Sequence, residues 1–282
     1  AKRIIATDII WEGTTYESVS GAIGGDFIKK VERRSGAKQT AFSLNVSGCT
    51  GGHSALNAAN CPANAIKAVA RILFRVKNEE PIRLIHLEGG GIRNNIASHC
   101  RADFTYETGS KGRIEKLVRE IAGELAYEYS LTDPEMTVAL ADFAGDTEAL
   151  DESSSNIVID LLHTLPSGSY IRSRQYGDAV FASRNMGNIC LAEDTLVVGY
   201  MFRGTIKTQT VDMMEQTLCL AGRFDAHYEE EYRYSGYIAG KDTPLVNVWK
   251  EVYQEATGKD LYFLTMHGGT DVGTMIDHLG GI

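Results

Sequence analysis

The segments TAFSLNVSGCTGGHS, residues 40–54, and ANAIKAVARILFRV, residues 63–76, decide the fold class. Residues 40–46 alternate apolar and polar side chains, which predicts a strand with one buried face. Residues 63–76 repeat apolar side chains at helical spacing, which predicts an amphipathic helix. A glycine-rich turn separates the two. This strand, turn and helix predict an α/β chain with α+β character in its central part.

The residues that follow complete a unit of six elements. Its remaining members are expected to be strands at 82–88 and 98–106, a helix at 111–129 and a strand at 135–143. Glycines 89 to 91 interrupt the chain between the first two of these strands. The resulting order, β-α-β-β-α-β, is that of a split-βαβ motif.

The next part of the chain repeats this element order without repeating the residues. A helix at 153–165 is expected to begin at Ser153 or Ser154 as N-cap. It is followed by a hairpin of residues 177–190 and 195–205, a helix at 210–223 and a strand at 226–237. The order α-β-β-α-β predicts a second split-βαβ half, so the two halves lie in tandem, as in ferredoxin-like units. A single irregular α+β domain is the alternative that these elements leave open.

The two ends of the chain have a different pattern. Lys2 to Thr7 predicts a short buried strand with Asp8 at its end. Thr243-Pro244 opens a helix over residues 245–257 that ends at Gly258, and a short strand follows at 261–265. We therefore expect the chain to leave one α/β domain, build a second domain and return to the first.

Composition excludes several classes of protein. The chain has 282 residues, a net charge of −9 and a pI near 5.3, so its surface repels the phosphates of nucleic acids. No apolar run approaches the ~18 residues of a membrane span, and the first residues do not resemble a signal peptide. The five cysteines are scattered without C-x-x-C spacing. This favours reduced thiols in a cytoplasmic protein over a disulfide framework or a cysteine zinc site.

Three polar motifs follow predicted strands and carry candidate binding groups. His53 ends a Gly-Gly turn, where an imidazolium could hydrogen-bond a developing oxyanion. Arg93 and Asn94 follow three glycines and suit a peptide or a carboxylate. Arg203 ends an apolar strand, where its charge needs a partner or an anion. A surface histidine, a hairpin that satisfies its own backbone and an arginine on a solvated face would give the same patterns.

Metal and nucleotide chemistry have weaker signals. The turn His267-Gly-Gly-Thr-Asp271 could hold an anion on its backbone, but it lacks the Lys-Ser/Thr of a P-loop. Asp8 could ligate a metal, although one carboxylate does not make a site. The chain contains neither H-x-D nor H-E-x-x-H, and no Gly-x-Ser-x-Gly nucleophile motif.

Taken in order, these motifs resemble those of the aminoacyl-histidine dipeptidases, a peptidase D-like branch of the di-zinc aminopeptidases and carboxypeptidases. The resemblance covers nearly the whole chain. It is carried by Thr7-Asp8, Gly51 to Ser54, Asn64-Ala-Ile-Lys67, Gly89 to Asn94, Pro166-Ser-Gly168 with Arg172-Ser173, Phe202-Arg203-Gly204 and His267-Gly-Gly269.

The resemblance implies a zinc-bearing α/β domain interrupted by a lid. Residues 1–38 and 239–282 would be pieces of the catalytic domain, and residues 39–238 would be the lid, with halves at about 39–150 and 151–238. Asp8 would bind one of two zinc ions, and His53 would polarise the scissile carbonyl. The substrate would contact Asn94, Arg203, Arg93 and Gly269, with Arg203 holding its C-terminal carboxylate.

The implied activity is metal-dependent hydrolysis of Xaa-His dipeptides, with zinc activating water. The family's other zinc ligands have no counterpart in these residues, so the chain as given is expected to be an inactive internal fragment. A non-catalytic binding or assembly module that retains the lid is the second hypothesis, and a related amidase or deacylase is the third. The expected partner is a small peptide, without nucleic acid or membrane, and a homodimer is an open alternative.

Overall fold

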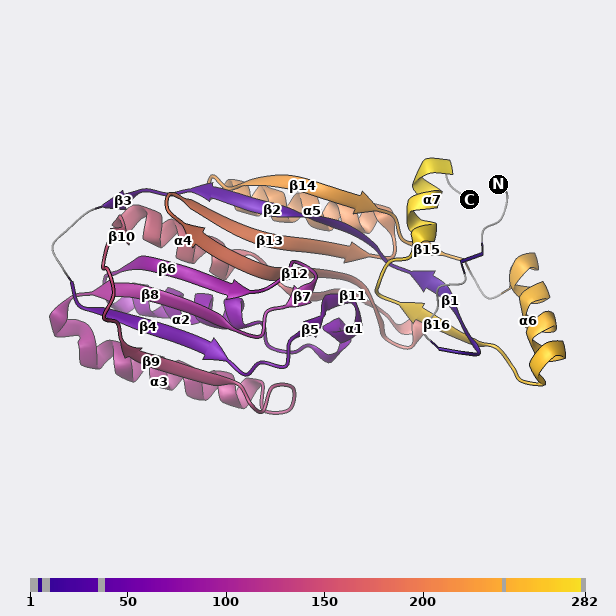
Figure 1. The fold of residues 1–282 in the computed structure, drawn as a ribbon, viewed down its shortest axis with the longest axis horizontal. Helices are drawn as coiled ribbons and strands as arrows, with labels where there is room; N and C mark the ends of the chain where they lie inside the picture. Colours follow the sequence, from indigo (N-terminus) through magenta and orange to yellow (C-terminus); the bar gives the residue numbers. More distant parts are fainter. Residues whose placement is uncertain (1–4, 7–10, 35–38, 240–241, 280–282) are drawn as a thin grey trace.

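The computed structural model describes residues 5–6, 11–34, 39–239 and 242–279. Figure 1 shows a broad sheet with helices along one face, and a smaller part of the chain at one end of that sheet. This arrangement of strands and helices confirms the predicted mixed α/β fold class. Among the described residues, no helix is long and apolar enough to cross a membrane.

The first half forms a split-βαβ unit, as the sequence predicts. Its strands lie side by side in the order β6-β8-β4-β9, and each neighbouring pair is antiparallel. The elements in chain order are β4 (Ala41–Ser47), α2 (Ala65–Glu79), β6 (Ile82–Gly90), β8 (Cys100–Tyr106), α3 (Lys111–Glu128) and β9 (Thr137–Asp142). We call residues 41–142 the first unit.

The second half forms another split-βαβ unit with the corresponding strand order, β14-β2-β13-β12. Its predicted helices and its predicted hairpin are all present. The elements in chain order are β2 (Gly21–Lys30), α4 (Glu152–Thr164), β12 (Ala179–Ala192), β13 (Thr195–Gly204), α5 (Lys207–Gly222) and β14 (His227–Tyr234). We call these residues the second unit. The strand β11 (Gly168–Ser173) pairs with β12 at its margin.

Strand β2 is the main difference from the sequence prediction, which assigned residues 1–38 to the flanking domain. It lies between β13 and β14 and supplies the strand that the predicted α-β-β-α-β order lacked. The first unit is therefore inserted between the first strand and the first helix of the second unit. Glycines weaken the strand pattern of β2, but its packing requires them. A Cβ on Gly24 would lie 2.4 Å from Cζ of Tyr232.

The two units join edge to edge into one sheet. The join is an antiparallel pairing of β6 with β12, in which Glu88, Gly89 and Gly90 face Cys190, Ile189 and Asn188. Across the helix layer, Lys67 of α2 donates to the carbonyls of Leu162, His163 and Leu165, at the carboxyl end of α4. An ammonium group at this position satisfies carbonyls that the helix itself leaves unpaired.

The start of α4 differs from the prediction of a serine N-cap. Asp151 caps the helix, because its side chain accepts from the backbone N–H of Ser154 at 2.6 Å. The neighbouring serines bind other segments. Ser154 Oγ accepts from the backbone N–H of Glu32, and Ser155 Oγ accepts from that of Leu84. These contacts tie α4 to β6 and to the residue that follows Val31.

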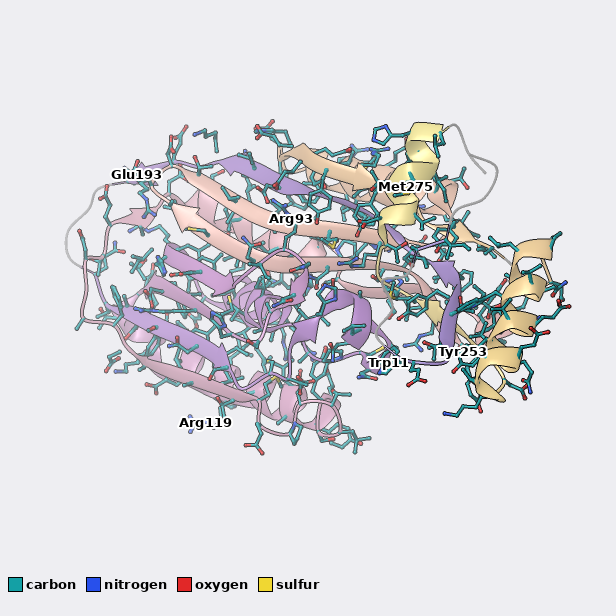
Figure 2. All side chains as sticks on the ribbon, turned by 45° about the vertical axis from the view of Figure 1, so that its right-hand side comes forward. Trp11, Arg93, Arg119, Glu193, Tyr253 and Met275 are labelled. Atoms are coloured by element: carbon teal, nitrogen blue, oxygen red, sulfur yellow. The ribbon has the colours of Figure 1, made fainter. Side chains whose placement is uncertain are left out.

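The flanking part is a small sheet with two helices. Its strand order is β15-β1-β16, with β1 (Thr14–Val19) parallel to β16 (Tyr262–Met266) and antiparallel to β15 (Tyr237–Ile238). The predicted helix is α6 (Pro244–Thr257), which Thr243 caps, and α7 (Asp271–Leu279) follows β16. Figure 2 shows Tyr253 of α6 facing this small sheet. Of the strand predicted at 2–7, all but Ile5 and Ala6 lies outside the described residues.

Candidate functional site

The candidate site lies where the broad sheet meets the flanking part. Strand β2 continues directly from β1 through Ser20, and β13 ends at Gly204 opposite Gly21. Two short strands of the first unit, β5 (Gly52–His53) and β7 (Asn95–Ile96), pair antiparallel near this junction. The short helix α1 (Ser54–Asn57) follows β5. The site therefore combines residues from the two units and from the flanking part.

The Gly-Gly turn fixes the orientation of His53. Gly51 and Gly52 have φ angles of +61° and +99°, which glycine adopts without strain. The Nδ1 atom of His53 accepts from the backbone N–H of Ala55 at 3.2 Å. A neutral ring in this position carries its proton on Nε2, which lies 3.4 Å from Nδ2 of Asn94; both atoms are then N–H donors, so the two side chains are neighbours without a hydrogen bond between them. The predicted neighbours His53 and Asn94 are therefore brought together.

The charge state of His53 differs from the expected imidazolium. Burial, and then the positive charge of Arg203, lowers the pKa of His53 below its ordinary value of 6.5. Both effects favour the uncharged ring, because each disfavours a second cation at this place. At neutral pH the group available to a ligand is thus a neutral Nε2–H donor.

Arg203 approaches the same turn from the second unit. It lies on β13, opposite Ser183 of β12, and its side chain is 3% exposed. Its Nε–H donates to Oγ of Ser54 at 3.1 Å, and Ser54 is the residue next to His53. The sequence predicted that Arg203 would need a partner or an anion. The structure gives it the hydroxyl of Ser54 as a partner and a place beside His53.

His267 belongs to the same cluster, although the sequence assigned no role to its side chain. Its Nδ1 lies 3.0 Å from Oγ of Ser20, and its Nε2 lies 2.6 Å from Oγ of Ser183. The ring is 7% exposed. Burial, and then the charge of Arg203, lowers the pKa of His267 to about 3. His267 is therefore a neutral residue of the flanking part that contacts Ser20, just before β2, and Ser183 of β12.

Gly269 has a packing role in the structure. A Cβ at this position would lie 2.2 Å from Cε2 of Tyr234, so a larger residue would have to displace the Tyr234 ring. This contact gives the glycine a packing role that involves no ligand. Its expected contact with substrate stays a prediction.

Arg93, which the sequence predicts to contact the substrate, forms ion pairs within the protein. One terminal nitrogen forms an ion pair with Asp26 of β2 at 2.8 Å, and the other forms one with Glu231 of β14. Its guanidinium also lies 6.0 Å from the centre of the Tyr232 ring. Figure 2 places Arg93 in the middle of the broad sheet. Its two terminal nitrogens thus already bind carboxylates of the second unit.

The expected zinc site does not fit the residues that the structure describes. Asp8, its predicted ligand, lies outside them. Within the described ranges, no three His, Cys, Asp or Glu side chains gather closely enough to hold a metal ion. Both ring nitrogens of His267 already contact serine hydroxyls. We therefore assign no step of a reaction to a metal held by these residues.

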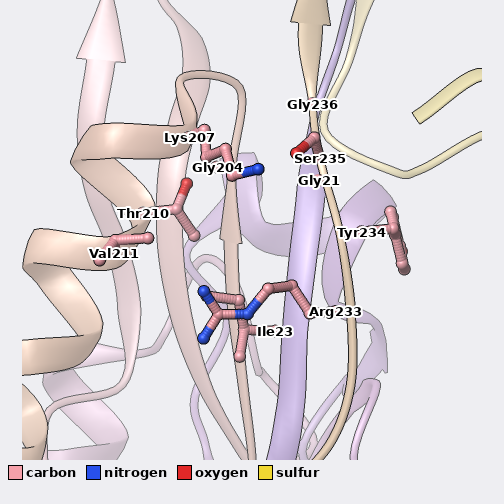
Figure 3. Close-up of a pocket in the computed structure, with 10 residues that line it drawn as sticks. All are labelled: Gly21, Ile23, Gly204, Lys207, Thr210, Val211, Arg233, Tyr234, Ser235 and Gly236. Atoms are coloured by element: carbon pink, nitrogen blue, oxygen red, sulfur yellow. The ribbon is translucent and has the colours of Figure 1, made fainter. Parts of the chain in front are cut away.

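Two hollows lie near the cluster. The larger has a volume of about 180 Å³ and is bordered by Ser54, Ser183 and Asn185, with Lys67 and Arg184 in its wall. Figure 3 shows the smaller one, between Gly204 and Ser235, near the start of α5. Its volume of about 10 Å³ holds at most about one water molecule. The larger hollow has room for part of a small ligand.

The residues that sequence reasoning missed are mainly small and polar. Ser20, Ser54 and Ser183 each contact a histidine or arginine of the cluster, and Asn185 binds the loop that carries Asn94. Serine and asparagine are common on strands and turns, so a single copy gives no signal. Ser54 stands inside the motif Gly51 to Ser54 and could have been singled out there.

Comparisons with known proteins agree with the resemblance found in the motifs. No family model matches the chain. It is 26% identical over 277 residues to the cytosol non-specific dipeptidase of Escherichia coli strain K12, covering 97% of this chain and 56% of the relative. The crystal structure of the aminoacylhistidine dipeptidase from Vibrio alginolyticus matches with a TM-score of 0.89 at 22% identity. That match covers 96% of this chain and 56% of the other.

These matches confirm the resemblance to peptidase D-like dipeptidases, and the structural match confirms the shared fold. The chain spans about half the length of each of these two proteins.

Proposed function

We propose that this chain is the substrate-binding lid part of a dipeptidase, together with segments of its catalytic domain. The observation that carries the proposal is the placement of Arg203 against Ser54, next to His53. It puts a buried cation and a neutral hydrogen-bond donor in one cluster. A dipeptide offers the matching pair of groups, a carboxylate and a peptide carbonyl.

The two residues would have different roles. His53 would donate its Nε2–H to the carbonyl oxygen of the scissile peptide and stabilise the negative charge that develops there. Arg203 would bind the C-terminal carboxylate through its terminal nitrogens, since its Nε–H is directed to Ser54. The amide of Asn94, beside His53, would contact the peptide group. Arg93 would hold the loop that carries Asn94, in place of the substrate contact expected from the sequence.

The two fused units give this proposal a simple geometry. His53 belongs to the first unit and Arg203 to the second, and the units are joined in one sheet. One polypeptide can thus present both groups to the same ligand without a partner subunit. The homodimer expected as an alternative is not needed for this pair of contacts.

Substrate range and location belong to the same proposal. A free carboxylate and a peptide carbonyl define dipeptides as a class, within which Xaa-His dipeptides are the group that the motifs favour. We propose that the complete protein acts on them in the cytoplasm with metal ions, zinc by resemblance, held largely by residues other than those described here. It stays a prediction that the 282-residue chain alone does not hydrolyse dipeptides.

The proposal is tested by ligand binding to the chain itself. We expect a dipeptide with a free carboxylate to perturb the ring resonances of His53 in NMR titrations, and its C-terminal amide to bind at least about tenfold more weakly. Arg203→Gln should remove this preference. Arg119→Gln, which changes an exposed arginine on α3, is the matched control. Equal binding of acid and amide by the wild-type chain would refute the role of Arg203.

A further inference from the structure

The loop of residues 91–95 extends from the first unit over the second. It follows β6 at Gly90, whose φ angle is +66°. A Cβ on Gly187 of β12 would lie 2.3 Å from the carbonyl oxygen of Arg93, so the loop touches the backbone of β12. The side chain of Arg93 extends further, to Asp26 and Glu231. The loop thus bridges the joint between the units.

Asn185 binds the backbone of this loop directly. It lies on β12 and is 4% exposed. Its Nδ2 donates to the carbonyl of Arg93 at 2.9 Å and to the carbonyl of Asn95 at 2.8 Å. An asparagine amide has two N–H groups, and here both serve the two residues that flank Asn94.

The loop in turn holds the turn of His53. Asn95 pairs with His53 in the β5–β7 ladder, and the backbone N–H of Ser54 donates to the carbonyl of Asn94 at 2.8 Å. Arg203 reaches Ser54 from the other side. Asn185 and Arg203 belong to the neighbouring, hydrogen-bonded strands β12 and β13, so both ends of this series of contacts lie on the same pair of strands.

We infer that Asn185 is a positioning residue, which sets the distance between the His53–Asn94 pair of the first unit and Arg203 of the second. The sheet itself joins the units over three residue pairs, from Glu88 to Gly90. Beyond Gly90 the loop depends on the amide of Asn185 and on the ion pairs of Arg93. The importance of this distance for catalysis rests on the proposed function. The role of Asn185 in setting the distance does not depend on that function.

Loosening the loop has a measurable consequence at His53. The groups that face its ring are Arg203 and Asn94, and burial together with the charge of Arg203 lowers its pKa. A loop that moves away from β12 carries His53 away from Arg203 and toward water. Both changes bring the pKa of His53 back toward its ordinary value.

The test is an NMR titration of the His53 ring in the 282-residue chain, assigned with His53→Ala. Arg203→Gln sets the scale, because it removes the cation. We expect Asn185→Ser and Asn185→Ala each to raise the His53 titration midpoint by at least about half of that shift. Asn156→Ser, on α4 and outside the β6–β12 pairing, should leave it unchanged.

Two variants at the position guard against loss of the fold, since serine keeps a hydroxyl and neither variant adds a charge. An unchanged midpoint in a folded Asn185→Ser or Asn185→Ala chain would overturn the inference, as would an equal shift in Asn156→Ser. Failure of the proposed function would show separately. The wild-type chain would then bind dipeptide acid and amide equally, while the Asn185 variants still moved the His53 titration.

Discussion

The guanidinium of Arg203 and the hydroxyl of Ser54 are in contact, at 3.1 Å between Nε and Oγ, although 148 residues separate them in the chain. Arg203 belongs to the second split-βαβ unit, and Ser54 follows His53 in the first. This contact brings the two residues that we assign to carbonyl and carboxylate binding into one cluster. It depends on the edge-to-edge pairing of β6 with β12.

Replacement of His53 tests its role at the developing oxyanion. In a protein that contains this chain and hydrolyses dipeptides, we expect His53→Ala to lower kcat by about 10²–10³. KM should change little, because the donor acts mainly in the transition state. Steady-state kinetics with one dipeptide measure both values. An exposed histidine, His227, supplies the control variant His227→Ala. An effect on KM alone would contradict the oxyanion role.

Replacement of Arg203 should change mainly KM, whereas replacement of His53 should change mainly kcat. We expect Arg203→Gln to raise KM for dipeptides with a free carboxylate by about 10–100-fold, with a smaller effect on kcat. Dipeptide amides should be affected little. The comparison of acid and amide substrates in the same variant separates carboxylate binding from a general loss of structure. Equal losses for both substrates would assign Arg203 a structural role instead.

Because burial lowers the pKa of His267, we expect the stability of the chain to depend on pH. Its pKa is about 3 in the folded chain and near 6.5 when exposed, so unfolding takes up a proton at mildly acidic pH. Its contribution is complete above pH 6.5 and is lost as the pH falls toward 3, by about 1.4 kcal/mol per pH unit. Urea unfolding between pH 7 and 4.5 should show His267→Gln losing less stability than the wild type. Parallel curves would show that His267 is protonated in the folded chain.

The contact of Lys67 with the end of α4 should stabilise the packing of the two units. We expect Lys67→Met to lower the free energy of unfolding by about 2–4 kcal/mol, because three part-buried carbonyls at the end of α4 lose their donor. Lys116→Met on α3 is the matched control, since the Lys116 side chain is 77% exposed. Urea titrations give both values. A loss below about 0.5 kcal/mol would mean that water replaces the ammonium group.

Much of the fold follows from local sequence patterns. The apolar periodicity of residues 63–76 and 111–129 predicts α2 and α3 within a few residues, and Thr243-Pro244 and Gly258 correctly mark the ends of α6. Strand β2 escaped prediction because its glycines hide the alternation of side chains. Those glycines make space for tyrosines of β14, which lies some two hundred residues later in the chain.

The grouping of the candidate residues was predictable where a residue stands in a distinctive motif. His53, Asn94 and Arg203 were proposed from such motifs, and the structure brings them together, whereas their roles stay predictions. Arg93 shares a motif with Asn94, but its partners Asp26 and Glu231 lie on strands that no local pattern connects to it. The neutral state of His53 also depends on Arg203, a distant residue, and so could not be read from the turn.

An experimental structure of this chain with a bound dipeptide tests the central claim most directly. The account predicts the C-terminal carboxylate on the guanidinium of Arg203 and the peptide carbonyl oxygen within hydrogen-bond distance of His53 Nε2. A dipeptide bound elsewhere, with its carboxylate away from Arg203 and its carbonyl away from His53, would contradict it.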